Sequence, residues 1–167
     1  LKADWTISKH SYPNKTAGST QNLSVGIDSL LNLTTGGNNT ACGFSSMLNL
    51  TTGSECCAFG SAASYVNTTG SRNSAFGFDA LFIGSTNNDC VGVGYSAGRY
   101  NLGSRNIFIG SNTDIDSPYT YTNSTAIGYN VKISASNQVK IGTSSETVKI
   151  DGDLDVNGTV ANFDMNT

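Results

Sequence analysis

Three consecutive segments of equal length carry one pattern: TACGFSSMLNLTTGSEC (Thr40–Cys56), CAFGSAASYVNTTGSRN (Cys57–Asn73) and SAFGFDALFIGSTNNDC (Ser74–Cys90). In each segment a small residue and then an apolar residue precede a glycine. This glycine recurs with a period of seventeen, at Gly26, Gly43, Gly60, Gly77 and Gly94. A fixed period of this length is typical of a fold built from stacked coils.

Alignment of the coils on this glycine shows the two faces of a short strand. The position two before the glycine is small in nearly every coil, as in Ser24, Ala41 and Ala58. The position directly before it is always apolar, and holds Val25, Cys42, Phe59, Phe76, Val93, Ile109, Ile127 and Ile141. Alternation with a period of two predicts a strand with two packed faces. We therefore expect Cys42 to be a small buried apolar residue.

The remainder of each coil indicates a turn. Thr-Gly pairs follow the glycine by nine and ten places, and glycine is free to take the positive φ that turns require. Seventeen residues are too few for a strand-helix-strand unit, which needs about 30. The sequence thus predicts an all-β parallel solenoid, each coil being one rung.

The regular period ends before the chain does. The last three glycine intervals, which end at Gly110, Gly128 and Gly142, are sixteen, eighteen and fourteen residues long. We expect a cap or connector over residues 1–21, because terminal repeats are atypical. The repeat domain then covers residues 22–143. A small β-element is expected over residues 144–167, where Val148–Ile150 and Leu154–Val156 alternate and Asp-Gly and Asn-Gly supply turns.

The repeat also has a family resemblance. The units Asn39–Ser54 and Asn73–Leu81 resemble the head repeats of trimeric autotransporter adhesins and related repeats in phage and large-virus fibres. The resemblance covers residues 22–143 and implies a left-handed parallel β-roll with three chains side by side. It further implies an extracellular fibre segment, on a virion or a bacterial cell surface, that attaches to a glycan or protein receptor of a host. The alternative is a purely structural shaft whose binding tip lies elsewhere.

A homotrimer is also expected from the volume of the coil. Two columns of small residues and one apolar column leave too little interior space to bury every apolar side chain in one thin roll. Three rolls that share an axis would bury the surplus apolar surface, which is worth about 25 cal/mol per Å².

Composition and charge also bear on nucleic acid and membrane as possible partners. Charged residues make up 13% of the 167 residues, the net charge is −3 and no basic run exists, so we expect no nucleic-acid partner. No apolar stretch reaches about 18 residues, so we expect no membrane insertion. The opening Leu1-Lys2-Ala3-Asp4 has the character of a piece of a longer protein.

Catalysis is not expected. Gly94-Tyr95-Ser96-Ala97-Gly98 matches the nucleophile elbow of hydrolases, but that elbow needs a following helix and a histidine base. The single histidine, His10, lies far upstream, and the residues of the motif already belong to columns of the repeat. We therefore predict that the protein is not an enzyme and needs no cofactor.

Candidate ligand-binding residues lie in the longest coil, between Gly110 and Gly128. They are the aromatic residues Tyr119 and Tyr121, which could contact a sugar or a protein, and the acidic residues Asp114 and Asp116. Packing at a chain-chain interface is the alternative role for the tyrosines. Calcium is a weaker alternative for the aspartates and for Asp151–Gly158, where alternation also fits a strand with one wet face.

The paired threonines at 34–35, 51–52 and 68–69 would stack on consecutive coils. Ice-binding solenoids display such ladders, but adjacent threonines in a strand point to opposite faces. Hydrogen bonding within turns and between coils is therefore the favoured interpretation. The four cysteines show no C-x-x-C spacing, and Cys56 and Cys90 are two coils apart, about 10 Å, so we expect free thiols.

Overall fold

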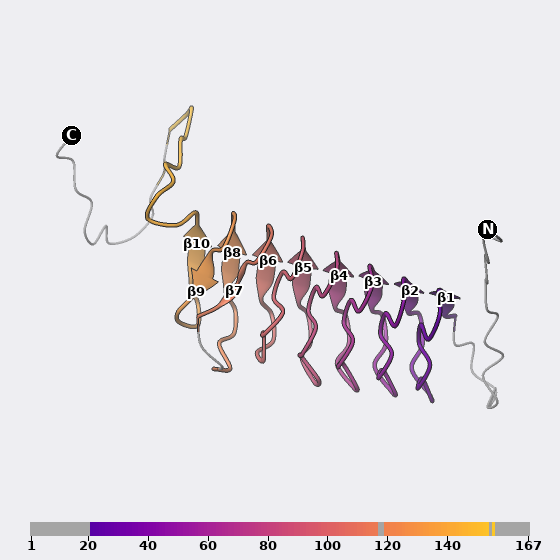
Figure 1. Ribbon diagram of the computed structural model, residues 1–167. Helices are drawn as coiled ribbons and strands as arrows, with labels where there is room; N and C mark the ends of the chain where they lie inside the picture. Colours follow the sequence, from indigo (N-terminus) through magenta and orange to yellow (C-terminus); the bar gives the residue numbers. More distant parts are fainter. Residues whose placement is uncertain (1–20, 117–118, 154, 156–167) are drawn as a thin grey trace, which may run out of the picture.

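A computed structural model describes residues 21–116, 119–153 and 155. Every regular element in these residues is a strand, and none is a helix. Eight short strands stack side by side in one parallel sheet, in the order β1-β2-β3-β4-β5-β6-β8-β10 (Figure 1). Their bounds are β1 Leu23–Val25, β2 Thr40–Cys42, β3 Cys57–Phe59, β4 Ser74–Phe76, β5 Val91–Val93, β6 Ile107–Ile109, β8 Thr125–Ile127 and β10 Val139–Ile141.

The strands pair in register with the repeat. Ala41 of β2 lies opposite Ala58 of β3, which follows it by one full period of the sequence. The irregular intervals also keep the pairing, since Val91 lies opposite Ile107 and Ile107 lies opposite Thr125. The eight strands enclose seven complete coils, so the prediction of an all-β parallel solenoid with coils of about 17 residues is confirmed.

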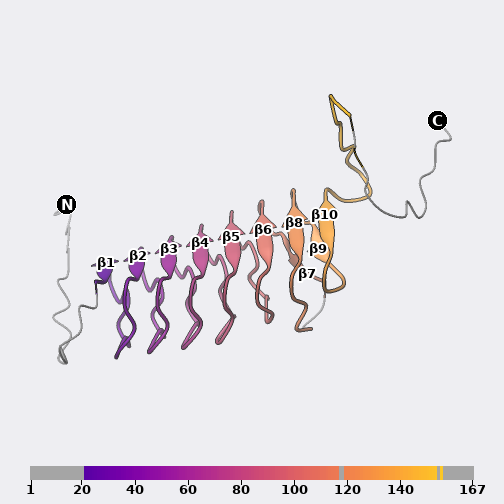
Figure 2. The ribbon, with the colours of Figure 1, turned by 180° about the vertical axis from the view of Figure 1, so that it is seen from behind.

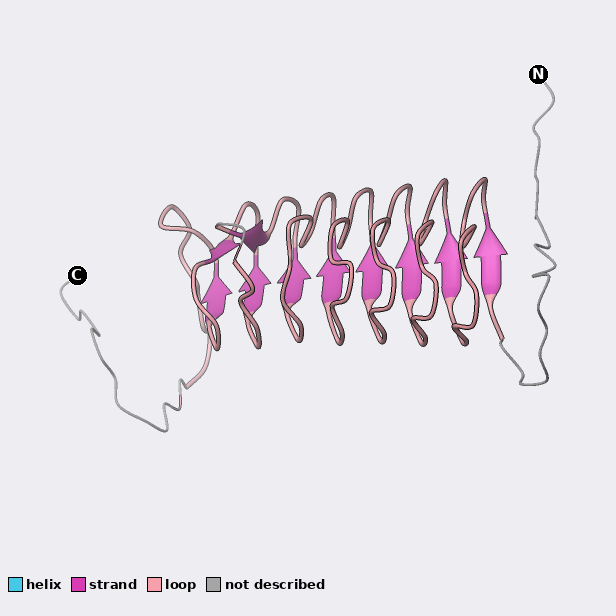
Figure 3. Cartoon of the chain, turned by 90° about the horizontal axis from the view of Figure 1, so that it is seen from below, coloured by secondary structure: helices cyan, strands magenta, loops and turns pink. Residues whose placement is uncertain are grey.

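A second, two-stranded sheet joins β7 (Asp114–Ile115) to β9 (Lys132–Ile133). Asp114 lies opposite Lys132 and the two strands are parallel. β7 lies in the coil between β6 and β8, and β9 lies in the coil between β8 and β10. Both strands lie apart from the eight-stranded sheet (Figures 2 and 3). After the glycine, the last two coils, which begin at Gly110 and Gly128, form these extended strands, whereas the earlier coils form a run of tight turns in the same segment.

The small column of each strand faces the interior. Ala41, Ala58, Ala75 and Ala126 are fully buried, and Phe108 fills the same column in β6. Larger side chains reach the core from the arcs that follow the strands. They include Leu30, Leu33, Met47, Leu50 and Leu81 in the early coils and Val131 and Ile133 in the last ones. The core is thus thin and continuous along the stack.

The recurrent glycine is required by the close approach of successive coils. Gly43 has a φ of +142°, and a Cβ placed on it would lie 2.3 Å from the carbonyl oxygen of Gly60 in the next coil. A side chain fits neither this backbone conformation nor this distance. The regular glycine period therefore records backbone-to-backbone stacking.

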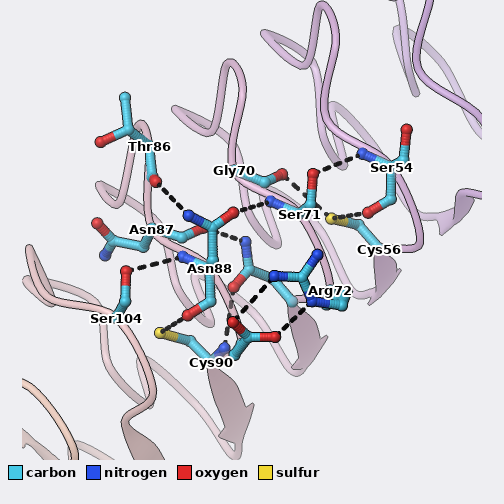
Figure 4. A network of polar contacts seen from close by, with 12 residues as sticks. Ser54, Cys56, Gly70, Ser71, Arg72, Thr86, Asn87, Asn88, Cys90 and Ser104 are labelled. Atoms are coloured by element: carbon cyan, nitrogen blue, oxygen red, sulfur yellow. Dashed lines mark hydrogen bonds and ion pairs between the residues drawn. The ribbon is translucent and has the colours of Figure 1, made fainter.

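Polar side chains continue the stacking at the turn edge of the coils. The backbone N–H of Ser54 donates to Ser71 Oγ at 3.1 Å, and the N–H of Ser71 donates to Asn88 Oδ1 at 2.8 Å (Figure 4). The N–H of Asn88 donates in turn to Ser104 Oγ at 3.0 Å. A backbone donor that the coil itself leaves unpaired is thus satisfied by the next coil.

The structure corrects one expectation at the end of the chain. Residues 144–153 contain no strand, although we expected one at Val148–Ile150. Val148 and Ile150 are about half exposed, at 49% and 53%, and no neighbouring strand pairs with this segment within the described residues. Alternation alone does not make a strand, because each strand needs a hydrogen-bonding partner. Leu154, residues 156–167 and nearly all of the expected cap lie outside the described residues.

The described part of the chain holds no helix of the length and hydropathy that a bilayer crossing demands.

Candidate functional site

The apolar column directly before each glycine points outward. We expected two packed faces on each strand, but Phe59, Phe76, Val93 and Ile109 are each about 40% exposed. Cys42, expected to be buried, shares this outer column and is only partly buried. Interior volume accounts for the difference, because the narrow coil holds a small residue in most positions of its inner column. The larger Phe108 of that column packs over Gly98, where an added Cβ would lie 2.6 Å from its ring.

These side chains form one surface, which we call the apolar face. It contains the outward residues of the strands and the residue that follows each glycine. Its exposed large members are Leu23, Ile27, Phe44, Phe59, Phe76, Phe78, Val93, Tyr95, Ile107, Ile109, Tyr129, Val139 and Ile141. The face runs along the whole row of strands, over roughly 35 Å at about 4.8 Å per coil. An exposed apolar patch of this extent is rare on a monomeric protein.

Aromatic rings order the centre of the apolar face. The rings of Phe59 and Phe76 stack at 5.4 Å with 4° between their planes, and those of Phe78 and Tyr95 stack at 5.5 Å with 8° between their planes. Each ring is held by its neighbour one coil away. Stacking of this kind restricts the rotamers of both rings in each pair.

The predicted tyrosines lie together. The rings of Tyr119 and Tyr121 are 5.6 Å apart and tilted by 46°. Tyr119 is 58% exposed, whereas Tyr121 packs against the core. Desolvation, together with Asp116 and Tyr119 nearby, raises the pKa of Tyr121. Three of the four predicted residues thus form one surface cluster.

Asp114 faces a different environment. Its carboxylate is buried and accepts the backbone N–H groups of Tyr100, at 3.0 and 3.2 Å, and of Ile115, at 2.9 Å. Burial raises the pKa of Asp114 to about 6, and these hydrogen bonds and the nearby cations Lys132 and Arg99 oppose that shift. Asp114 therefore holds the arc of the preceding coil in place.

An open cleft of about 230 Å³ lies above Asp114. It forms at the step between the last tightly turned arc and the straight arc of β7. Its lining residues are Tyr95, Ser96, Arg99, Tyr100, Asn112, Asp114 and Lys132. Of these, sequence reasoning had singled out only Asp114 as a candidate ligand contact. A signal for Arg99 was present, because its column otherwise holds Leu31, Leu48, Tyr65 and Phe82.

The threonine pairs take part in the fold. The hydroxyl of Thr34 donates to the carbonyl of Thr51, and that of Thr51 donates to the carbonyl of Thr68, each at 2.9 Å. The first threonine of each pair is thus used between coils, in agreement with the ladder interpretation. The four cysteines are free thiols. Burial raises the pKa of Cys56 and Cys90.

Calcium was a weaker alternative for the acidic residues. Within the described residues, no three His, Cys, Asp or Glu side chains are grouped as metal ligands. Asp151 instead pairs with Lys149 at 2.8 Å on an exposed segment.

By its fold, the chain is a parallel β-solenoid with an exposed apolar face. No protein-family model, curated protein or solved structure matches it.

Proposed function

We propose that the chain is a segment of a homotrimeric extracellular fibre and that three copies pack through the apolar face. The observation that carries the proposal is the unbroken row of exposed large apolar side chains along the sheet. Burial of such a row is worth about 25 cal/mol per Å². The resemblance to adhesin heads implies three copies, and a closed ring of three leaves no apolar face open to water.

The fibre is proposed to attach to a glycan or protein receptor on a host surface. Each coil adds about 4.8 Å of length, so a stack of coils is a spacer that holds a contact site away from the particle or cell. This attachment role is supported by resemblance to adhesins and fibres and is an analogy at the level of the fold. The competing role is a structural shaft, which would use the same interface without a receptor.

Analytical ultracentrifugation tests the assembly. We expect a trimer for the unaltered chain and a monomer for the double variant Phe59→Glu/Phe76→Glu, since burying two unpaired charges at one interface costs several kcal/mol. Leu102→Glu is the matched control, because Leu102 is similarly exposed, at 38%, but lies off the apolar face. A stable monomer for the unaltered chain would refute the proposal, provided that circular dichroism shows it to be folded.

Binding to host cells separates the adhesin from the shaft. The trimeric protein is expected to bind a panel of host cells, and the variant Tyr119→Ala/Tyr121→Ala tests the predicted tyrosine cluster. Binding that persists in this variant would remove the tyrosines from the receptor site and leave the adhesin role standing. An absence of binding to any cell or glycan would favour the shaft.

A further inference from the structure

We propose that the cleft above Asp114 binds one anionic sugar ring, which carries a carboxylate or a sulfate. The inference rests on the proposed attachment function and names the ligand class and the surface that would serve it. None of the residues of the tyrosine cluster lines this cleft.

The charges of the cleft are arranged by depth. Two carboxylates, Asp79 and Asp114, are almost fully buried, with residue exposures of 6% and 2%. The two cationic residues are less deeply buried, since the Arg99 side chain is 36% exposed and Lys132 is partly exposed. A ligand that enters the cleft therefore meets positive charge first, although the four charges balance in total.

Arg99 is held in a fixed orientation. Its guanidinium lies 5.2 Å from the ring centroid of Phe82 and 5.5 Å from that of Tyr100. One terminal nitrogen contacts Asp79 at 3.3 Å. The two rings and Asp79 fix the guanidinium, so its terminal nitrogens are pre-organised to receive an acceptor. The Nε atom has no hydrogen-bond partner in the described structure but is buried, out of reach of a ligand.

Lys132 supplies the second cation. Its Nζ donates to the backbone carbonyl of Asn112 at 2.9 Å, which uses one of its three donors. The parallel pairing of β7 with β9 sets the place of Lys132, directly opposite Asp114. The remaining N–H donors of Lys132 can therefore reach an acceptor in the cleft.

The neutral lining favours a sugar over a simple anion. Tyr100 is 52% exposed and gives the cleft an aromatic surface, which suits the apolar side of a sugar ring. Tyr95 also lines the cleft, but it belongs to the apolar face and would lie against a neighbouring copy in the proposed trimer. Ser96 and Asn112 add polar groups that can pair with hydroxyls. The volume is below the range of about 300–1,000 Å³ that drug-sized ligands fill, so a single ring fits better than a chain.

The test is a titration of the trimeric chain with 3′-sialyllactose, lactose and a sulfated heparin disaccharide, followed by protein-detected NMR. We expect at least one anionic sugar to bind and lactose not to bind. Lys132→Gln and Tyr100→Ala should each weaken binding about tenfold, since a charge-assisted hydrogen bond or an aromatic contact of about 1.4 kcal/mol is then lost. Arg105→Gln is the matched control, because it removes an exposed cation outside the cleft.

The two anionic probes identify the source of the charge. Preference for sialyllactose assigns a carboxylated sugar, and preference for the heparin disaccharide assigns a sulfated one. No binding of either probe overturns the inference. So does binding that Arg105→Gln weakens as much as Lys132→Gln, because the attraction would then be diffuse. Host-cell binding that survives Lys132→Gln would overturn the cleft while leaving the adhesin role intact.

Discussion

Asn87 fills the space that Gly84 leaves open: a Cβ placed on Gly84 would lie 2.4 Å from Asn87 Nδ2. In the preceding coil the two residue types occur in the opposite order. There Asn67 points inward and brackets Gly70, accepting its N–H at 2.8 Å and donating to its carbonyl at 3.0 Å. Gly84 thus stands at the position of Asn67, one coil on, and Asn87 stands at the position of Gly70. The asparagine and the glycine have exchanged places, and the interior stays filled.

The exchange predicts strong coupling between the two positions. Gly84→Asn alone should lower the free energy of unfolding by about 1–3 kcal/mol, because it overpacks the interior against Asn87. Asn87→Gly alone should cost a similar amount, because the carbonyl of Asn101 loses a hydrogen bond of 2.8 Å. The double variant restores the Asn67 and Gly70 arrangement and should unfold within about 1 kcal/mol of the unaltered chain.

Urea unfolding of the four proteins at one protein concentration measures this coupling. If the free energy of unfolding lost in the double variant equals the sum of the two losses in the single variants, the two positions are independent and the exchange is accidental.

The stacking glycines predict a sharp contrast between two substitutions. Gly77→Ala would place a Cβ 2.3 Å from the carbonyl oxygen of Gly94, at a φ of +137°. We expect a loss of about 3 kcal/mol or more, because backbone strain and a backbone clash act together. Gly152→Ala is the control, since no atom lies within 4 Å of its added Cβ. Equal melting temperatures for the two variants would contradict the stacking role.

The sequence predicted the stacking of the coils well, but not which side chains fill their interior. The period shows where coils begin, because every coil needs a glycine at the point where backbones meet. The alternation of Ala58 and Phe59 places them on opposite faces of the strand, and we expected both faces to be packed, but the alternation does not show which face is open to solvent. The answer depends on interior volume, which is a property of the assembled coil. The meeting of Arg99, Asp114 and Lys132 was also hidden, because it depends on the last three coils, whose unequal lengths break the regular columns.

Asp114 predicts a pH-dependent stability. Its pKa is raised from 3.8 to about 6 in the folded chain, so the folded state binds this proton more tightly than the unfolded chain does. The stabilisation from Asp114 is therefore complete below about pH 3.8 and is lost as the pH rises through about 6. Asp114→Asn, which keeps an acceptor for the N–H groups, should remove this loss.

Between pH 4 and pH 7, the free energy of unfolding of the variant is expected to rise relative to that of the unaltered chain. The difference reaches up to about 3 kcal/mol for a pKa shift of this size. Denaturant midpoints measured at each pH give the two curves. Curves that stay parallel across this range would show that Asp114 does not carry the pH dependence.

The corner residue of each coil predicts a stabilising substitution. This position has a φ near +60° in successive coils, with +60° at Asn38 and +61° at Glu55. Asparagine tolerates this left-handed conformation, whereas glutamate bears a cost of about 1–2 kcal/mol there. Both residues are exposed, and the attraction between Glu55 and Arg72, which pairs with Asp89, acts across solvent and contributes little to stability. Glu55→Asn should therefore raise the free energy of unfolding by about 0.5–1 kcal/mol, and the reverse change Asn38→Glu should lower it by a similar amount. Thermal unfolding of the two variants beside the unaltered chain measures both shifts, and a loss of stability in Glu55→Asn would show that the charge of Glu55 outweighs its backbone strain.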